Sequence, residues 1–307
     1  MVDFIDVHAS GKYGNAAYST RDLRPGDIIL REAPLLVVQP PPNGKGVSFL
    51  DSIFNAKNIP ASSIEHEIQK LSPVHKAELR KIACEEDTDI SRFMSCHYDI
   101  RPKQNEAPTA FGLFLKGSYI NHSCQPNLLY FWDEKMESMT WVVLKHIVAG
   151  QEVNISYLPM FDWQEVNERR ALLQNIFPFE CNCMLCEKES SNPTVFAHQH
   201  KLRDLHMALI NIASSQDGNT RSFSLDLQHL VGAYLAAITQ ELPPGQTLDP
   251  RLYRAYYLAA SIYSQSGNPE KGVLLGSKAT VLVDQLYGKH SPQGQHELEF
   301  CKQLYSL

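Results

Sequence analysis

Three cysteines stand close together at Cys181, Cys183 and Cys186, within six residues of chain. Thiolates at this spacing are typical of tetrahedral zinc sites, which need four ligands and release folding free energy when the metal binds. Cys124 is the fourth ligand that we expect, because it lies in another compact polar motif. The alternative that the residues leave open is a set of buried, reduced thiols.

The remaining cysteines predict no site of this kind. Cys84 and Cys301 stand among apolar residues with helical spacing, and we expect both to be ordinary thiols. The total of seven cysteines is odd, and the first residues show neither a basic n-region nor an apolar h-region. Together these features favour a reducing compartment, the cytoplasm or the nucleus, in which cysteines bind metal or stay free instead of forming disulfides.

Two further motifs are polar and short. Residues 118–127 read SYINHSCQPN, and residues 150–157 read GQEVNISY, a turn followed by a short strand that ends at Tyr157. Taken alone, the Asn, His and Ser side chains of the first motif are typical of a turn that satisfies its own backbone. A tyrosine at the end of a strand is, taken alone, typical of an amphipathic core residue. Neither motif therefore indicates chemistry by itself.

The elements that must position these motifs alternate between strands and helices. Turn signals separate short apolar runs over residues 7–38, which predicts β-strands, and residues 47–95 switch to helical spacing. One apolar stripe there consists of Phe49, Leu50, Ile53 and Phe54, and Ser72-Pro73 is typical of the entry to a helix whose apolar stripe is Val74, Leu79 and Ile82. Strand character returns over residues 111–157. It is clearest at 128–132 and 139–144, on either side of a polar turn.

A helix is predicted at about 163–175, and Lys188–Pro193 is the best candidate for a domain boundary. The chain beyond it is helical in pattern. Large and small residues alternate there with the spacing of a tetratricopeptide helix pair, at Tyr256, Ala259, Ala260, Tyr263 and Ala279, with Gly267 at the turn. A single unit of this kind leaves a plain helical bundle equally open.

The composition bounds the class of protein. The chain has 307 residues, of which 43% are apolar and 20% charged, enough for folded cores in two domains. With 28 basic against 34 acidic residues, its net charge of −6 argues against a protein that binds nucleic acid through charge. Because no apolar run is long enough for a membrane helix, we expect no membrane span.

In their order and combination, four segments resemble a SET domain with its cysteine-rich post-SET segment: GKYGNAAYSTRDLRPGDIILREAPL, NHSCQPN, GQEVNISY and FPFECNCMLC. They resemble most the SMYD-like and fungal SET-domain proteins, which carry a helical insert and a helical C-terminal domain. No cysteine-rich MYND finger follows Val38, where a proline-rich loop stands instead. The sequence therefore resembles a member of this subtype without that finger.

The resemblance implies an α+β fold with short β-sheets and a pseudoknot. It implies a SET core over residues 1–46 and 109–162 and a helical insert over 47–108. A zinc-binding post-SET segment would occupy residues 163–190, and a TPR-like helical domain residues 191–307.

SET proteins transfer the methyl group of S-adenosylmethionine to the side-chain amine of a protein lysine, so the resemblance implies this activity on a histone or another protein. The residues that it places around the cofactor are Tyr13, Gly14 and Asn15 at the methionine end, Asn121 and His122 at the adenosine, Phe179 on the adenine ring, and Tyr157. Zinc held by Cys124, Cys181, Cys183 and Cys186 would tie the segment of Phe179 to the loop of Asn121 and His122.

The resemblance also implies a lysine channel lined by Tyr157, Phe177 and Ser118, with Tyr157 as the catalytic residue. The Tyr157 hydroxyl would orient the amine, while alignment of the reacting atoms supplies most of the acceleration. Many relatives carry a tyrosine at the position of Phe177. A phenylalanine lacks that hydroxyl and leaves room for higher methylation states.

Two residues depart from the family pattern. Ala16 stands where a second glycine is usual, and Cys96 where relatives carry an asparagine that helps to hold the methionine carboxylate. These departures keep open an alternative, a catalytically weak or inactive SET-fold scaffold that acts through its helical C-terminal domain. The partner we expect is a protein with an accessible lysine, a histone tail being one candidate. We expect a monomer that binds neither nucleic acid nor membrane directly.

Overall fold

A computed structural model describes residues 2–10, 14–40, 59–84, 86–101, 109–158, 165–177, 179–192, 204–205, 225–242, 248–288 and 290–305. The chain divides into two compact units. The first consists of Met1–Pro159 and Ala171–Cys181, and the second of Met160–Arg170 and Asn182–Leu307.

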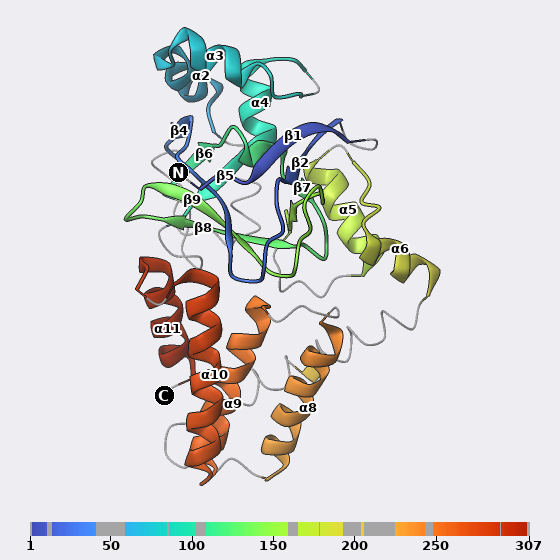
Figure 1. Ribbon diagram of the computed structural model, residues 1–307, viewed down its shortest axis with the longest axis vertical. Coiled ribbons are helices and arrows are strands. Elements are labelled where there is room, and N and C mark those ends of the chain that lie inside the picture. Colours follow the sequence, from blue (N-terminus) through green and yellow to red (C-terminus); the bar gives the residue numbers. More distant parts are fainter. Residues whose placement is uncertain are drawn as a thin grey trace. The chain divides into compact units, whose positions relative to one another are not determined.

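Short strands build the first unit (Figure 1). They are β1 (Ile5–Ser10), β2 (Gly14–Ser19), β3 (Ile28–Glu32), β4 (Leu36–Val38), β5 (His97–Ile100), β6 (Ala110–Leu113), β7 (Asn121–His122), β8 (Leu128–Asp133), β9 (Ser138–Val143) and β10 (Asn154–Ile155). They pair as β1–β2, β10–β7, β3–β9–β8 and β4–β6–β5. The pair β7 and β10 is parallel, and the others are antiparallel.

The hairpin of β8 and β9 confirms the strands predicted at 128–132 and 139–144. Strand β9 is buried along its whole length because β3 and β8 cover its two edges. Trp141 of β9 is 0% exposed, and the rings of Tyr98 and Phe114 meet it edge-on at centroid distances of 5.6 and 5.7 Å. This edge-to-face packing places the main core directly beneath the polar motifs.

A second core lies between the sheet β4–β6–β5 and the helices α2 (Ala61–Lys70), α3 (Pro73–Leu79) and α4 (Asp89–Cys96). Ser72 begins α3 as predicted, since its hydroxyl accepts the backbone N–H of His75 at 3.1 Å. The prediction that Val74 belongs to the buried stripe is wrong, because α3 has only seven residues and Val74, in its first turn, is 68% exposed. The helical stripe predicted at residues 49–54 lies outside the described residues.

The parallel pair β7–β10 brings the two polar motifs side by side, with Asn121 opposite Asn154 and His122 opposite Ile155. Asn127 and Asn154 lock the arrangement through a reciprocal pair of hydrogen bonds. The Asn127 backbone N–H donates to Asn154 Oδ1 at 3.0 Å, and the Asn154 N–H donates to Asn127 Oδ1 at 2.8 Å. Segments about thirty residues apart thus share one rigid joint.

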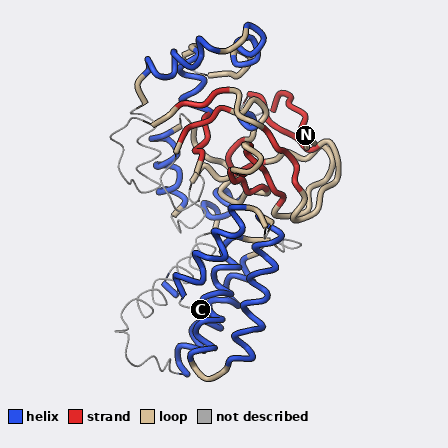
Figure 2. The backbone as a smooth tube through the Cα atoms, turned by 90° about the vertical axis from the view of Figure 1, so that its left-hand side faces the viewer, coloured by secondary structure: helices blue, strands red, loops and turns tan. Residues whose placement is uncertain are grey.

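Helix α5 (Val166–Ile176) confirms the helix predicted before the cysteine cluster, and α6 (Met184–Ser191) follows the cluster. The second unit continues with α8 (Leu225–Glu241), α9 (Pro250–Gln265), α10 (Pro269–Tyr287) and α11 (Pro292–Tyr305), the orange to red helices of Figure 1 and long blue helices of Figure 2. Within the described residues, none of the helices combines the length and the apolar character that crossing a membrane requires.

Helices α9 and α10 approach closely at Gly272, where an added Cβ would come within 2.9 Å of the Ala260 carbonyl oxygen. A glycine is therefore needed at this crossing.

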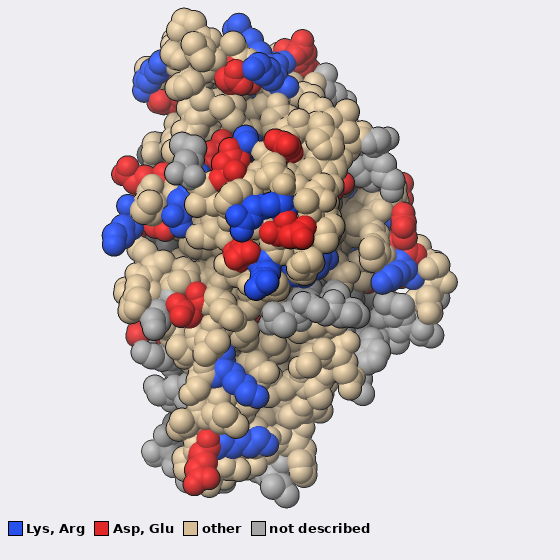
Figure 3. All heavy atoms as spheres, in the orientation of Figure 1, with Lys and Arg blue, Asp and Glu red and all other residues tan. Residues whose placement is uncertain are grey.

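On the molecular face that Figure 3 shows, Lys and Arg side chains are interspersed with Asp and Glu.

Candidate active site

A cavity of about 140 Å³ lies in the first unit, next to the joint between the two polar motifs. It is bounded by the end of α4 and by β5, by the turn η1 (Gly117–Tyr119), and by segments that follow β10 and α5. Its lining residues are Met94, Ser95, Cys96, His97, Tyr98, Asp99, Gly117, Ser118, Ile120, Tyr130, Ile155, Tyr157, Ile176 and Phe177. The structure thus brings all three residues of the predicted lysine channel, Ser118, Tyr157 and Phe177, to one cavity.

Tyr157 follows β10 and is fixed at both ends. Its backbone N–H donates to His122 Nδ1 at 2.9 Å, and its hydroxyl donates to the Ile120 carbonyl at 3.0 Å. Burial raises the pKa of Tyr157 well above its usual range, and the nearby Cys96, Tyr130 and Glu152 raise it further. The hydroxyl therefore stays protonated at neutral pH and acts as an oriented dipole, not as a base.

His122 joins the two polar motifs through its side chain. Because Nδ1 accepts the Tyr157 N–H, the ring proton resides on Nε2, which lies 3.2 Å from the Cys124 sulfur. The imidazole thus links a cysteine of the cluster to the backbone of Tyr157. The family resemblance predicts only a contact between His122 and adenosine, because this link depends on a tautomer that the fold sets.

The turn at residues 116–119 presents Gly117 and Ser118 to the cavity. Glu32 accepts the backbone N–H groups of Lys116 at 3.1 Å and Gly117 at 3.0 Å, and the Tyr98 hydroxyl donates to the Gly117 carbonyl at 2.7 Å. Gly117 also packs against Trp141 so closely that an added Cβ would come within 2.7 Å of the indole ring. The turn is therefore held by hydrogen bonds on one side and by ring packing on the other.

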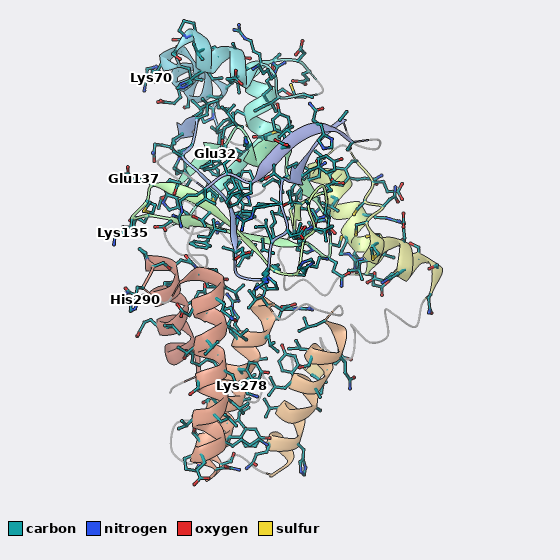
Figure 4. All side chains as sticks on the ribbon, in the orientation of Figure 1. Glu32, Lys70, Lys135, Glu137, Lys278 and His290 are labelled. Atoms are coloured by element: carbon teal, nitrogen blue, oxygen red, sulfur yellow. The ribbon has the colours of Figure 1, made fainter. Side chains whose placement is uncertain are left out.

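Glu32, labelled in Figure 4, lies among the strands of the first unit. Burial raises its pKa, while the backbone N–H groups of Lys116, Gly117 and Leu115 act in the opposite direction. The Lys116 ammonium reaches the Asp3 carboxylate at 2.6 Å and the Ile5 carbonyl at 2.7 Å, and so fastens the same turn to the N-terminal segment. No sequence signal pointed to Glu32, because its partners lie 84 residues away.

The cavity wall is largely uncharged. Burial raises the pKa of the Cys96 thiol and of the Tyr130 phenol, each to about 12. It lowers the pKa of His97, whose Nδ1 lies 3.1 Å from the carbonyl oxygens of Phe93 and Met94. At neutral pH these groups are a thiol, a phenol and an uncharged imidazole, and together they form a wall that disfavours a buried cation.

Two aromatic residues that follow α5 in the chain place their rings near Tyr157. The Phe177 ring lies 4.9 Å from Tyr157 between centroids, and the Phe179 ring lies 6.4 Å from Tyr157 and 6.1 Å from His122. Both predicted aromatic residues therefore gather at the joint of the polar motifs. Asn121, which precedes His122 in the chain, donates from its side-chain amide to Glu152 Oε1 at 3.2 Å.

The β1–β2 hairpin carries the other predicted cofactor residues. Gly14 has φ of +76° and no atom within 4 Å of where a Cβ would stand, so space is open there. Asn15 is exposed, and Tyr13 lies outside the described residues. Ala16 lies in β2 opposite His8, is 0% exposed, and is absent from the described residues with positive φ, so alanine causes no backbone strain at this position.

The cysteine cluster assembles as predicted, with the Sγ atoms of Cys124, Cys181, Cys183 and Cys186 within 4.8 Å of one another. Cys124 and Cys181 are 3.9 Å apart. Four thiolates bound to zinc at ~2.3 Å stand about 3.8 Å apart at the corners of a tetrahedron. The cluster therefore has the ligand type and the spacing to hold a metal ion.

A buried ion pair supports this cluster. Arg169 of α5 lies with Nη2 3.5 Å from the Cys186 sulfur and 2.7 Å from Glu189 Oε2. Arg169 and Glu189 are each 5% exposed. A guanidinium beside a thiolate offsets negative charge, which a set of four cysteine ligands accumulates around one divalent metal.

The family model of the SET domain matches residues 14–158, the segment that holds the polar motifs and most of the cavity wall. Residues 14–158, slightly less than half of the chain, are thus similar to a SET domain. Phe177, Phe179 and three of the four clustered cysteines lie beyond the matched residues of this SET domain.

Curated relatives agree with this assignment. The histone-lysine N-methyltransferase set5 of Schizosaccharomyces pombe is 33% identical over 81 residues, which are 26% of this chain and 25% of that protein. The protein-lysine N-trimethyltransferase SMYD5 of Mus musculus is 32% identical over 89 residues, which are 29% of this chain and 21% of that protein. The match thus spans about a quarter of the length of these relatives. It confirms the predicted resemblance to SET-domain proteins of SMYD-like type.

Among solved structures, Polycomb Repressive Complex 2 of Chaetomium thermophilum matches 100% of this chain and 35% of that chain, at 10% identity and a TM-score of 0.28.

Proposed function

We propose that this SET domain transfers the methyl group of S-adenosylmethionine to the side-chain amine of a protein lysine. The observation that carries the proposal is the position of Tyr157, whose protonated hydroxyl stands in a cavity where Asp99 is the one carboxylate among the described lining residues. The relatives set5 and SMYD5, whose names describe lysine methyltransferases, support it. A histone or another protein with an accessible lysine is the proposed substrate.

The residues around the cavity fit the cofactor. The open backbone at Gly14 and the exposed Asn15 would hold its methionine end, and the predicted Tyr13 precedes them in the chain. The backbone of Asn121 and His122 would hold the adenosine, and Phe179 the adenine ring. When bound, S-adenosylmethionine supplies a sulfonium methyl group, which passes to the amine while the C–S electron pair returns to sulfur.

The chain's own groups prepare the amine. A lysine side chain has a reference pKa of ~10.4 and arrives as an ammonium ion, which must lose a proton before its nitrogen can form a bond. A wall of buried tyrosines, Cys96 and neutral His97 favours the uncharged amine by desolvation. The Tyr157 hydroxyl, tied to the Ile120 carbonyl, offers the amine an oriented partner.

Three finer assignments belong to the same proposal. Zinc is the metal that the four cysteines would hold, and residues 163–190 would act as a post-SET segment. The ring of Phe177 would leave room at the amine for a second or third methyl group, in keeping with the trimethyltransferase named among the relatives. The helices of residues 191–307 would form a TPR-like domain.

Binding of S-adenosylmethionine, measured by titration calorimetry, tests the proposal first. The wild type and Tyr157→Phe should bind the cofactor with similar affinity, because the variant removes only the hydroxyl that serves the amine. Transfer of labelled methyl to core histones or to lysate proteins should occur with the wild type alone. No binding at millimolar cofactor would refute the enzyme and leave the SET-fold scaffold.

A further inference from the structure

Among the described residues that line the cavity, Asp99 is the one carboxylate. It stands on β5 immediately after Tyr98, and its side chain is 18% exposed. The remaining titratable groups of the described lining are uncharged at neutral pH, since burial moves the pKa of the thiol and of the phenols further above neutrality and lowers the pKa of the imidazole. They are Cys96, His97, Tyr98, Tyr130 and Tyr157. The described part of the lining therefore presents one negative group to whatever enters the cavity.

Arg101 pairs with this carboxylate. Its Nη2 lies 2.5 Å and its Nε 3.2 Å from the same oxygen, Asp99 Oδ2. Arg101 is not a lining residue, and its side chain is only 10% exposed. The Asp99 carboxylate is thus part of the cavity lining, while the Arg101 guanidinium binds that carboxylate from outside the lining.

The field of the pair reaches its neighbours on two strands. Asp99 raises the pKa of Tyr130 on β8 beyond the effect of burial, and Arg101 lowers it. On β5, burial lowers the pKa of His97 and Asp99 acts in the opposite direction. For a group in the cavity the two opposite charges cancel only in part, because Asp99 is among the lining residues and Arg101 is not. Removing either one takes away its share of this balance.

We propose that Asp99 selects the substrate lysine by attracting its ammonium group into the cavity, and that Arg101 limits this attraction so that the amine can shed its proton. This inference rests on the proposed lysine methyl transfer. A carboxylate without a partner within ~4–6 Å of an ammonium would raise the ammonium pKa by about 1–3 units and hold the substrate in its unreactive form. With Arg101 in place, recognition and deprotonation are both served.

Cation selection is tested without any chemistry by two small probes, n-butylammonium as a lysine side-chain mimic and n-butanol as its uncharged counterpart. Protein with ¹³C-labelled methionine methyl groups reports binding through Met94, which lines the cavity, while the exposed Met136 serves as an internal reference. The wild type should prefer the ammonium. Equal affinity for the two probes in the wild type would overturn the proposal.

Variants assign the preference to the pair. Asp99→Asn should weaken the binding of n-butylammonium about tenfold and leave the affinity for n-butanol unchanged. The control Glu134→Gln, at an exposed carboxylate outside the lining, should change neither affinity. Because Asp99→Asn takes the Asp99 carboxylate away from Arg101, the double variant Asp99→Asn/Arg101→Gln, which removes both charges of the pair, is tested in parallel. It should lose the preference as well, and an unaltered preference in both variants would refute the role of Asp99.

Kinetics test the second half of the proposal. In Asp99→Asn, KM for the protein substrate should rise and the rising limb of the kcat–pH profile should move to lower pH by about one unit. In Arg101→Gln, KM should fall and the limb should move to higher pH. Unmoved profiles in an active enzyme would overturn the balance of the pair. Absence of transfer by the wild type would instead refute the proposed function, and the probe titrations would still decide cation selection.

Discussion

The substitution Gly117→Ala tests how the turn that faces the cavity is held. The added Cβ would stand 2.7 and 2.9 Å from two ring carbons of Trp141, whereas carbon atoms pack best at ~3.5–4.0 Å. Trp141 is fully buried and has no room to retreat. The backbone must therefore move, although Glu32 holds the Gly117 N–H and Tyr98 holds its carbonyl.

Overpacking of a buried site costs about 1–3 kcal/mol, and weakening one of these hydrogen bonds adds about 1 kcal/mol. We therefore expect Gly117→Ala to lower the free energy of unfolding by roughly 2–4 kcal/mol. For a unit of this size, each kcal/mol lowers Tm by about 2–4 °C, so Tm should fall by roughly 4–16 °C. Methyl transfer should fall as well, because the displaced turn carries Ser118 into the cavity.

The assay is thermal unfolding followed by near-ultraviolet circular dichroism, which reports the environment of Trp141. Ser118→Ala is the matched control in the same turn, since it removes only the bond from the Ser118 hydroxyl to the Phe114 carbonyl at 2.6 Å. That loss should cost no more than about 1.5 kcal/mol. A Gly117→Ala protein that melts with the wild type, or above Ser118→Ala, would refute the packing argument.

Further predictions concern the groups around the turn and the cluster. Because burial raises the pKa of Glu32, the stability of the wild type relative to Glu32→Gln should fall as pH rises from about 4 through that raised pKa. Urea denaturation at several pH values measures this, and a stability difference that does not change with pH would contradict it. Arg169→Met should cost about 3–5 kcal/mol because it strands the buried Glu189, and Arg169→Met/Glu189→Leu should recover most of the loss in the same denaturation assay. Cys183→Ser should release about one equivalent of zinc by elemental analysis while Cys84→Ser retains it, and equal metal content would exclude the proposed site.

Local patterns in the sequence were sufficient to predict those elements that depend on neighbouring residues only. The hairpin of β8 and β9 alternates around a polar turn, and the helical cap at Ser72 precedes a proline, so both could be predicted from neighbouring residues. The SET family followed from the order of motifs that the family model also matches. The spacing of Cys181, Cys183 and Cys186 alone predicted a cysteine cluster, and Cys124 lies next to them in the structure.

The groups that hold the site rigid left no such trace. Glu32 and Gly117 are separated by 85 residues, and Tyr98 reaches the same glycine across 19. A glutamate at the end of a strand is an ordinary surface residue until a distant turn presents its N–H groups. The tautomer of His122 likewise depends on the Tyr157 backbone, 35 residues away. Val74 shows the converse, since helical spacing cannot reveal which turn of a short helix meets the core.

The central claim is that the cavity beside Tyr157 methylates a lysine amine. Its most direct measurement is tandem mass spectrometry of core histones and lysate proteins incubated with S-adenosylmethionine that carries a deuterated methyl group. Labelled methyl groups on lysine Nζ with the wild type, and their loss with Tyr157→Phe at unchanged cofactor affinity, are the predicted result. Label confined to other side chains, or equal lysine labelling by Tyr157→Phe, would contradict the account.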